Sequence, residues 1–444
     1  MSDTRIHQLR YFDLTIIVIS LVIGMGIFKT PALVARDSHT PLLFFLAWIV
    51  GGLIALCGAL TYAEIGSRYP ITGGYYRIFA YAYHPAVGFM INSIILISNA
   101  ISTAGVALIG AEYAVHAFFP VHWQTATSMQ MVAIGSIILF FIVNILGLKP
   151  SAVIQNLLMV TKLLMMGVLI LALFIPARAV QPAGDQVAVH VSFIDSIKAL
   201  GVALIAVTFS YEGYQQTINF GREVHRPGKT IPRAIITAML VIIPLYLLMN
   251  LAYVRVIGFS RLGHTEAIAG QLASALFGRV GDTLVSLLLF VSVLGYVNVA
   301  LLSNPRVIFA MSEDGLLPVA FRRQNHEKQT FGYALLLFTL ICLLALVLSN
   351  QFSVLLNYII FLDSIGMIFS AATIFVLRRR KQMEPGTAYV MKLYPLLPVV
   401  FIVAYAAIAI SVAVVDLKST LISIGLLAGS FMLYLFFRLL ERKA

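Results

Sequence analysis

Two glycines, Gly24 and Gly26, interrupt the first long apolar segment of this 444-residue chain. A helix that is broken inside a membrane exposes carbonyl groups at the end of its first half and N–H groups at the start of its second half. The N–H end attracts a carboxylate, and the carbonyl end attracts an ammonium group. The run Val22-Ile23-Gly24-Met25-Gly26 is therefore a candidate site for a small zwitterion, although glycines in such a segment also serve close helix packing.

The sixth long apolar segment contains a second candidate interruption, Phe209-Ser210-Tyr211-Glu212-Gly213. It lies five segments after the first, which is the spacing expected of two inverted repeats of five helices each. Two broken helices that lie antiparallel can hold both ends of a free α-amino acid. Glu212 can face the cavity between them and meet a cation or carry a proton, or it can be a hydrogen-bonded structural carboxylate.

Lys162 is placed well inside the fifth apolar segment, about ten residues from the nearer end. An unpaired charge at this depth costs at least about 2.5–3.5 kcal/mol, so such residues usually face a cavity or mark an ion pathway. The alternative is a lysine that extends to the membrane surface. Ten residues correspond to about 15 Å of helix, which is a long reach for one side chain. This depth favours a functional role for Lys162.

A bundle of membrane-spanning helices is needed to position these residues. Hydrophobic residues make up 60% of the chain and charged residues only 11%, too few to solvate the surface of a soluble protein. Each crossing needs about 20 apolar residues. The sequence predicts one all-α integral membrane domain over 1–444 with twelve spans, at 13–35, 41–65, 85–116, 127–147, 152–175, 195–218, 232–257, 281–303, 330–349, 353–377, 393–413 and 417–438.

The distribution of basic residues predicts the orientation. Alternating loops place 21 Lys and Arg residues on the side of the two termini and 7 on the other side, while Lys162 and Lys198 lie in or near spans. Because cytoplasmic loops are enriched in basic residues, both termini are predicted to be cytoplasmic, in the plasma (inner) membrane. These loops account for the net charge of +12, so the lipid bilayer is the expected partner and nucleic acid is not.

No enzyme signature is present in the sequence. It has no phosphate-binding Walker loop, no zinc-protease motif and no nucleophile elbow. The two cysteines, Cys57 and Cys342, lie in apolar segments and form neither a metal-binding spacing nor a disulfide framework. We therefore expect no catalytic activity, no cofactor and no metal site.

The motifs together resemble the amino acid–polyamine–organocation superfamily, and within it the L-type amino acid transporter branch. The run Ile23 to Phe28 is similar to the branch's I-G-S-G-I-F, and Phe209 to Gly213 is similar to its F-A-Y-x-G. Gln155, seven residues before Lys162, is similar to the Q-x6-K of the fifth span. Further similarities occur at 59–66 with 73–75, at 219–235 and at 297–318, so the resemblance covers spans 1 to 8 in order.

The resemblance implies a LeuT-type fold in which helices 1–5 and 6–10 are inverted repeats, helices 1 and 6 are broken, and two helices are added. The first repeat would cover 1–180, the second 190–380, and the added helices 390–444. It also implies the site. The substrate carboxylate would bind the backbone of Gly24, Met25 and Gly26, and the α-amino group would meet carbonyls around Val22, Ile23, Phe209, Ser210 and Glu212. Phe209 would close over the substrate from outside, and the Lys162 ammonium would take the place of a sodium ion.

Three departures from the family pattern change what can be carried over. Met25 replaces a small hydroxyl residue, so only the backbone contact to the carboxylate is retained. Glu212 stands where many relatives have a small residue, which favours a cationic side chain or proton coupling. The outer loop from Ala117 to Thr127 has no cysteine, so no disulfide-linked heavy-chain subunit is expected, and the protein is expected to be a monomer or a weak homodimer.

The sequence therefore predicts Na⁺-independent secondary transport of amino acids by alternating access, through exchange or H⁺-coupled symport. Neutral L-amino acids are the default substrates. The alternative substrates are cationic amino acids or amines, which would pair with Glu212. A non-transporting amino-acid sensor on the same fold is a different class, and we expect a longer soluble tail for it than the one after the last span.

Overall fold

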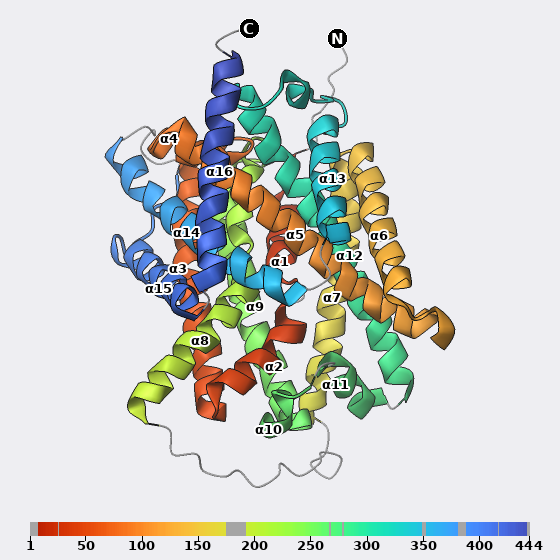
Figure 1. Cartoon of the computed structure of the whole chain (residues 1–444). Coiled ribbons are helices and arrows are strands. Elements are labelled where there is room, and N and C mark those ends of the chain that lie inside the picture. Colours follow the sequence, from red (N-terminus) through yellow and green to blue (C-terminus); the bar gives the residue numbers. More distant parts are fainter. Residues whose placement is uncertain are drawn as a thin grey trace.

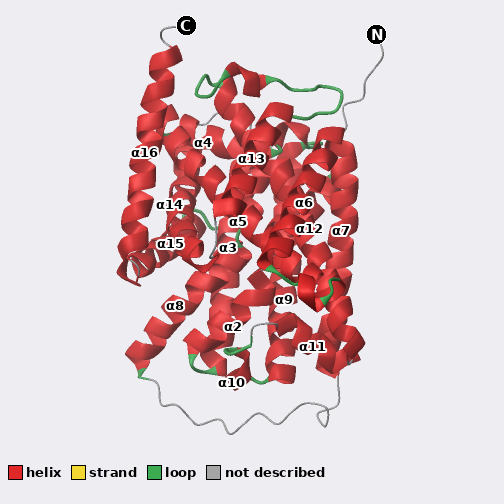
Figure 2. Cartoon of the chain, turned by 45° about the vertical axis from the view of Figure 1, so that its right-hand side comes forward, coloured by secondary structure: helices red, strands yellow, loops and turns green. Residues whose placement is uncertain are grey.

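The computed structural model describes residues 8–24, 26–174, 192–265, 268–277, 279–348, 352–380, 388–415 and 417–441. Across these ranges the chain is a bundle of helices without a strand, and most long helices run along one common direction (Figures 1 and 2). The helices are α1 Tyr11–Val22, α2 Gly26–Ser38, α3 Pro41–Arg68, α4 Gly74–Ala82, α5 Pro85–Phe118, α6 Ala126–Leu146, α7 Leu148–Ile170, α8 Phe193–Tyr211, α9 Pro227–Ile257, α10 Phe259–Leu262, α11 Ile268–Phe277, α12 Arg279–Glu313, α13 Gly332–Leu348, α14 Phe352–Arg379, α15 Leu396–Val415 and α16 Leu417–Glu441.

Eleven segments in the described ranges are long and apolar enough to cross a membrane. They match eleven of the twelve predicted spans. The remaining prediction, 330–349, corresponds to the shorter apolar helix Gly332–Val347, which lies at the lower end of the length that a crossing needs. The first and sixth predicted spans are not continuous helices, since α1 ends at Val22 and α8 ends at Tyr211. The division into repeats at 1–180, 190–380 and 390–444 stays a prediction, and residues 181–189 between the first two lie outside the described ranges.

The breaks in the first and sixth spans are buried inside the bundle, whereas the start of α8 is exposed. The second half of the first span, α2, packs against α8, while α3 packs against both α8 and α9. Around them α12 packs against α5 and α7. Large apolar side chains are exposed on peripheral helices, for example Leu139 of α6, Leu164 of α7, Val414 of α15 and Leu421 of α16. Lipid is the expected solvent for these side chains, so the polar groups of the centre are enclosed by a hydrophobic outer surface.

One end of the central region is closed by polar contacts. The Leu9 N–H donates to the Glu223 carbonyl at 2.7 Å, and the His225 N–H donates to the Leu9 carbonyl at 3.0 Å. The Glu223 carboxylate receives Arg306 of α12 at 2.6 Å, with the arginine only 2% exposed. The same guanidinium lies 4.4 Å from the centre of the Phe220 ring. These contacts tie the segment before α1 to the segment that follows the second break.

Candidate functional site

The first break separates α1 from α2. The Ile23 N–H still donates to the Ile19 carbonyl at 2.7 Å, but the Gly24 N–H turns back to the Val22 carbonyl at 2.8 Å, so the helical ladder ends there. Helix α2 starts again at Gly26. Met25, a predicted site residue, lies outside the described residues. The predicted interruption at Gly24 and Gly26 is therefore present at the expected position.

The second break begins after Tyr211, where α8 ends. Glu212 has an extended backbone, and the chain continues as a 3-10 segment, η4, over Tyr214–Asn219. Gly213 has φ +123°, and a Cβ atom on it would lie 2.2 Å from the Leu21 carbonyl oxygen. Only glycine accommodates both the backbone angle and this approach. The two broken spans consequently touch through their main chains.

Short polar contacts hold the two breaks together. The hydroxyls of Thr30 on α2 and Ser210 on α8 are 2.7 Å apart. A Cβ atom on Gly26 would lie 3.0 Å from the Ser210 Cα, so the start of α2 packs directly on α8. The Tyr246 hydroxyl of α9 lies 3.1 Å from the Ser210 carbonyl oxygen and 3.3 Å from the Val22 carbonyl oxygen. One side chain therefore bridges the carbonyl ends of both broken helices.

Lys162 contacts the first break directly. Its ammonium donates to the Ile23 carbonyl at 2.5 Å, and the side chain is 1% exposed. The sequence left open whether this lysine extends to the membrane surface, and its geometry excludes that alternative. A buried cation is retained here by a carbonyl that the helix interruption leaves free, as the desolvation cost requires. Lys162 does not line the cavity and contacts the first break from the side of α7.

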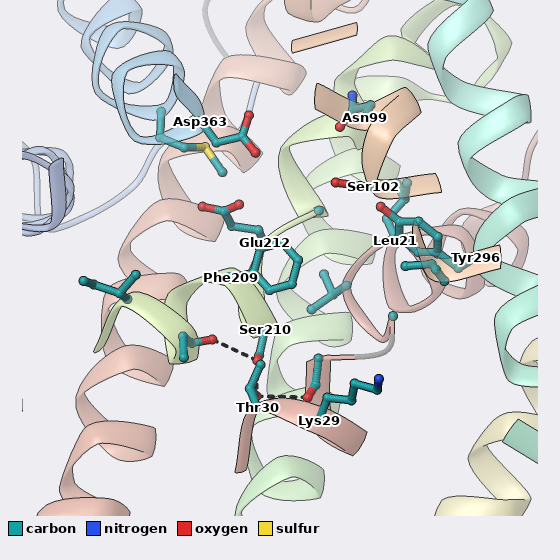
Figure 3. A pocket seen from close by; sticks show the side chains of 18 of the residues that line it. Leu21, Lys29, Thr30, Asn99, Ser102, Phe209, Ser210, Glu212, Tyr296 and Asp363 are labelled. Atoms are coloured by element: carbon teal, nitrogen blue, oxygen red, sulfur yellow. Dashed lines mark hydrogen bonds between the residues drawn. The ribbon is translucent and has the colours of Figure 1, made fainter. Parts of the chain in front are cut away.

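A cavity of about 590 Å³ opens beside the two breaks. Of the predicted site residues, Val22, Gly24, Gly26, Phe209, Ser210 and Glu212 line it, and Ile23 does not. The cavity extends along α2 to Arg36 and Asp37, which form an ion pair that is exposed on the arginine side. In Figure 1 this part of α2 lies at the opposite end of the molecule from the end of α16. Figure 3 shows Phe209 between the start of α2 and Glu212.

Several cavity residues were not predicted from the sequence. Asp363 of α14 faces Glu212 across the upper part of the cavity in Figure 3. Tyr296 of α12 lies against Gly24, at 3.5 Å from the position of an added Cβ. Asn99 and Ser102 of α5 line the same space. A charged residue within an apolar segment was the available signal for Asp363, but the facing of α5, α12 and α14 is not readable from their periodicity.

Two interrupted spans that meet at a cavity inside a membrane-embedded bundle are typical of a secondary transporter. The chain belongs to the amino acid permease family, whose model matches residues 9–437. It is therefore a multi-pass membrane transporter of the amino acid–polyamine–organocation type and not an enzyme.

Individual relatives cover most of the chain. The serine/threonine exchanger SteT of Bacillus subtilis (strain 168) is 29% identical over 443 residues, which are 98% of this chain and 96% of the relative. The large neutral amino acids transporter small subunit 2 of Homo sapiens is 25% identical over 397 residues, 87% of this chain and 72% of the relative. Solute carrier family 7 member 13 of Mus musculus is 28% identical over 403 residues, 89% of this chain and 82% of the relative. The resemblance inferred from the motifs is thereby confirmed.

Proposed function

We propose that this protein transports small neutral L-amino acids across the plasma membrane by Na⁺-independent exchange. The observation that carries the proposal is the Lys162 ammonium on the Ile23 carbonyl, at the break that borders the cavity. A lysine ammonium at this place supplies a positive charge to the carbonyl end of α1. No soluble cation is then needed there. Exchange is preferred to H⁺ symport because a relative of nearly full coverage bears the name of a serine/threonine exchanger.

The proposed binding mode uses the main chain at both breaks. The substrate carboxylate binds the backbone N–H groups at the start of α2, where Gly24 and Gly26 leave room for close approach. The α-ammonium group is directed to the carbonyl end of α8, around Phe209, Ser210 and Glu212. The Ile23 carbonyl already accepts a hydrogen bond from Lys162 and the Ser210 carbonyl one from Tyr246, so each supplies its second lone pair, whereas the Val22 carbonyl is already contacted by both the Gly24 N–H and the Tyr246 hydroxyl.

The direction of access follows from the two ends of the bundle. The cavity reaches the Arg36–Asp37 pair at one end, whereas the contacts of Leu9, Glu223 and Arg306 close the other. The excess of basic residues on the side of the termini supports a cytoplasmic closed end and an external opening. Neither the loop Ala117 to Thr127 nor any other outer loop supplies a cysteine for a covalent partner, which supports function without a disulfide-linked subunit.

Uptake by purified protein in liposomes tests the proposal. We expect labelled serine, threonine or alanine to enter vesicles that are preloaded with unlabelled amino acid, at the same rate in Na⁺ and in choline media. Vesicles without internal amino acid should show at most a small fraction of this uptake, since exchange requires a returning substrate. Strict dependence on Na⁺ would contradict the role of Lys162, and equal uptake into empty vesicles would contradict exchange.

Replacement of Tyr246 by phenylalanine tests the bridge between the two breaks. The hydroxyl donates one proton, shared between two carbonyls, and loss of a hydrogen bond worth about 0.5–1.5 kcal/mol corresponds to about a two- to tenfold weaker substrate affinity. The measurement is equilibrium binding of labelled substrate to the purified variant. Tyr253→Phe is the matched control, because Tyr253 lies two turns further along α9 and its buried hydroxyl has no hydrogen-bond partner among the described residues. Equal affinities of the two variants would exclude a role for the bridge.

A further inference from the structure

Glu212 and Asp363 bring two carboxylates to the same part of the cavity. Figure 3 shows their side chains facing one another, Glu212 from the second break and Asp363 from α14. The Tyr405 hydroxyl donates to Glu212 at 3.0 Å, and the Ser98 hydroxyl lies 3.3 Å from each oxygen of Asp363. Both partners are neutral. Within the described residues, neither carboxylate forms an ion pair with a lysine or an arginine.

Two uncompensated negative charges are costly at this place. Each carboxylate within a membrane span already carries a cost of about 2.5–3.5 kcal/mol, and their mutual repulsion adds to it. A single hydroxyl donor satisfies only one of the four or so lone-pair positions that each carboxylate offers. The pair therefore lacks one positive charge and several hydrogen-bond donors that the described protein does not provide.

Gln216 supplies an independent indication of a missing donor. Its side-chain oxygen is buried and has no hydrogen-bond partner among the described residues, and the residue lines the same cavity. The side-chain nitrogen of Gln216 lies 3.5 Å from the Asn99 side-chain oxygen, which also faces this space. The side chains of Glu212, Gln216 and Asp363 therefore all present acceptor oxygens to the same cavity. Such a set matches an ammonium or guanidinium group with several N–H donors.

We propose that the Glu212–Asp363 pair binds one positive charge whenever substrate is bound. With a neutral amino acid this charge is a proton shared by the two carboxylates. With a cationic amino acid it is the basic group of the side chain, and the proton leaves to water in the cavity. The net charge of the occupied site is then the same for both substrate classes. The inference rests on the proposed function, since the same cavity holds the amino acid.

The other titratable groups around the pair are phenols and the charged residues of the outer cavity. Tyr75 of α4, Tyr214 of η4, Tyr296 of α12 and Tyr405 of α15 interact electrostatically with one or both carboxylates. A phenol ordinarily stays neutral up to about pH 9, so these groups do not change charge in the range of interest. Further out, Lys29, Arg36 and Asp37 line the cavity along α2.

The pH dependence of binding tests the proposal with opposite signs for the two substrates. We expect labelled alanine to bind the purified full chain in nanodiscs more tightly as the pH falls from about 9 to about 5.5. Labelled arginine should bind more weakly over the same change, because protons compete with its side chain. Each affinity changes by at most about tenfold per pH unit, which is the limit for one linked proton.

Two variants test whether the pH dependence of alanine and arginine binding arises from Glu212 and Asp363. In Asp363→Asn and in Glu212→Gln the affinity for alanine should become independent of pH, and the affinity for arginine should fall at least about tenfold. Glu112→Gln is the control, since Glu112 is exposed on α5 and does not line the cavity. It should retain both slopes. Thermal unfolding of each variant shows whether it is folded. If one of the two variants does not fold, the other variant and the two wild-type pH slopes still test the proposal.

The outcomes separate the shared-charge site from the proposed transport. Slopes of the same sign for alanine and arginine, slopes that persist in both pair variants, or alanine binding without any arginine binding would each overturn the shared-charge site while leaving amino-acid transport intact. Failure of the wild-type protein to bind any amino acid at any pH would instead contradict the proposed function, and the inference would fall with it.

Discussion

The Lys162→Ala variant should fold and reach the membrane but lose at least about 100-fold of its transport efficiency, measured as kcat/KM of counterflow in liposomes. The ammonium makes a charge-assisted hydrogen bond to the Ile23 carbonyl, at 2.5 Å and away from solvent. Its removal leaves that carbonyl without its donor and removes the tie between α7 and the first break. A loss of 100-fold corresponds to about 2.7 kcal/mol, within the range measured for hydrogen bonds to charged groups.

Lys198→Ala is the matched control for this variant. Lys198 lies on α8, which carries the second break, but its side chain is exposed and the residue does not line the cavity. Its replacement should leave kcat/KM within about twofold of wild type. Transport at the wild-type rate by a folded Lys162→Ala protein would remove the assigned role. A loss caused by unfolding would be recognised by a lowered melting temperature of the variant in detergent.

The second large effect is expected at the start of α2. Gly26→Leu should abolish detectable substrate binding, because an added Cβ would already lie 2.9 Å from the Ser210 side-chain oxygen and 3.0 Å from its Cα. The larger side chain must separate α2 from α8 and occupy the space that the carboxylate needs. Gly26→Ala should show a smaller loss, of about tenfold in affinity. Scintillation-proximity binding of labelled substrate measures both variants.

A matched control distinguishes this local effect from a general cost of leucine in a span. Gly135 lies on α6, where an added Cβ meets nothing within 4 Å. Gly135→Leu should therefore retain wild-type affinity and expression. Unchanged affinity of Gly26→Leu would exclude the main-chain site, whatever the result for the control.

The membrane-embedded helical class was predictable because length and composition determine it. Ten continuous spans could be placed from apolar runs, since every backbone polar group must be satisfied within its own segment in lipid. The break at Gly24 was also visible, because glycine recurs at the equivalent place in the sixth span, as expected of paired interrupted helices. The helix α13, Gly332–Leu348, lies inside the predicted span 330–349, and the last residue of that span lies outside the described ranges.

The site was predicted only where it depends on local sequence. Gly213 and Lys162 each indicate the site without knowledge of their neighbours. Glycine permits a backbone angle that breaks a helix, and a lysine inside an apolar span has a high desolvation cost. Tyr246 and Asp363 were missed because their roles arise from contacts between helices that are distant in sequence. An apolar segment that faces lipid on one side and protein on the other has no polar stripe to indicate which residue points inward.

The contact between the Gly213 backbone and the Leu21 carbonyl bears on how selectivity can change. In the proposed binding mode, main-chain atoms recognise only the portion that all amino acids share, and no side chain is needed for that task. Discrimination between amino acids then rests on other residues that line the cavity, which include Asn99 and Ser102. Substitutions of these lining residues can change the preferred amino acid without altering the main-chain contacts to the carboxylate and the ammonium group. The site is in this sense modular: one part binds the carboxylate and ammonium groups that all amino acids share, and a different part contacts the substrate side chain.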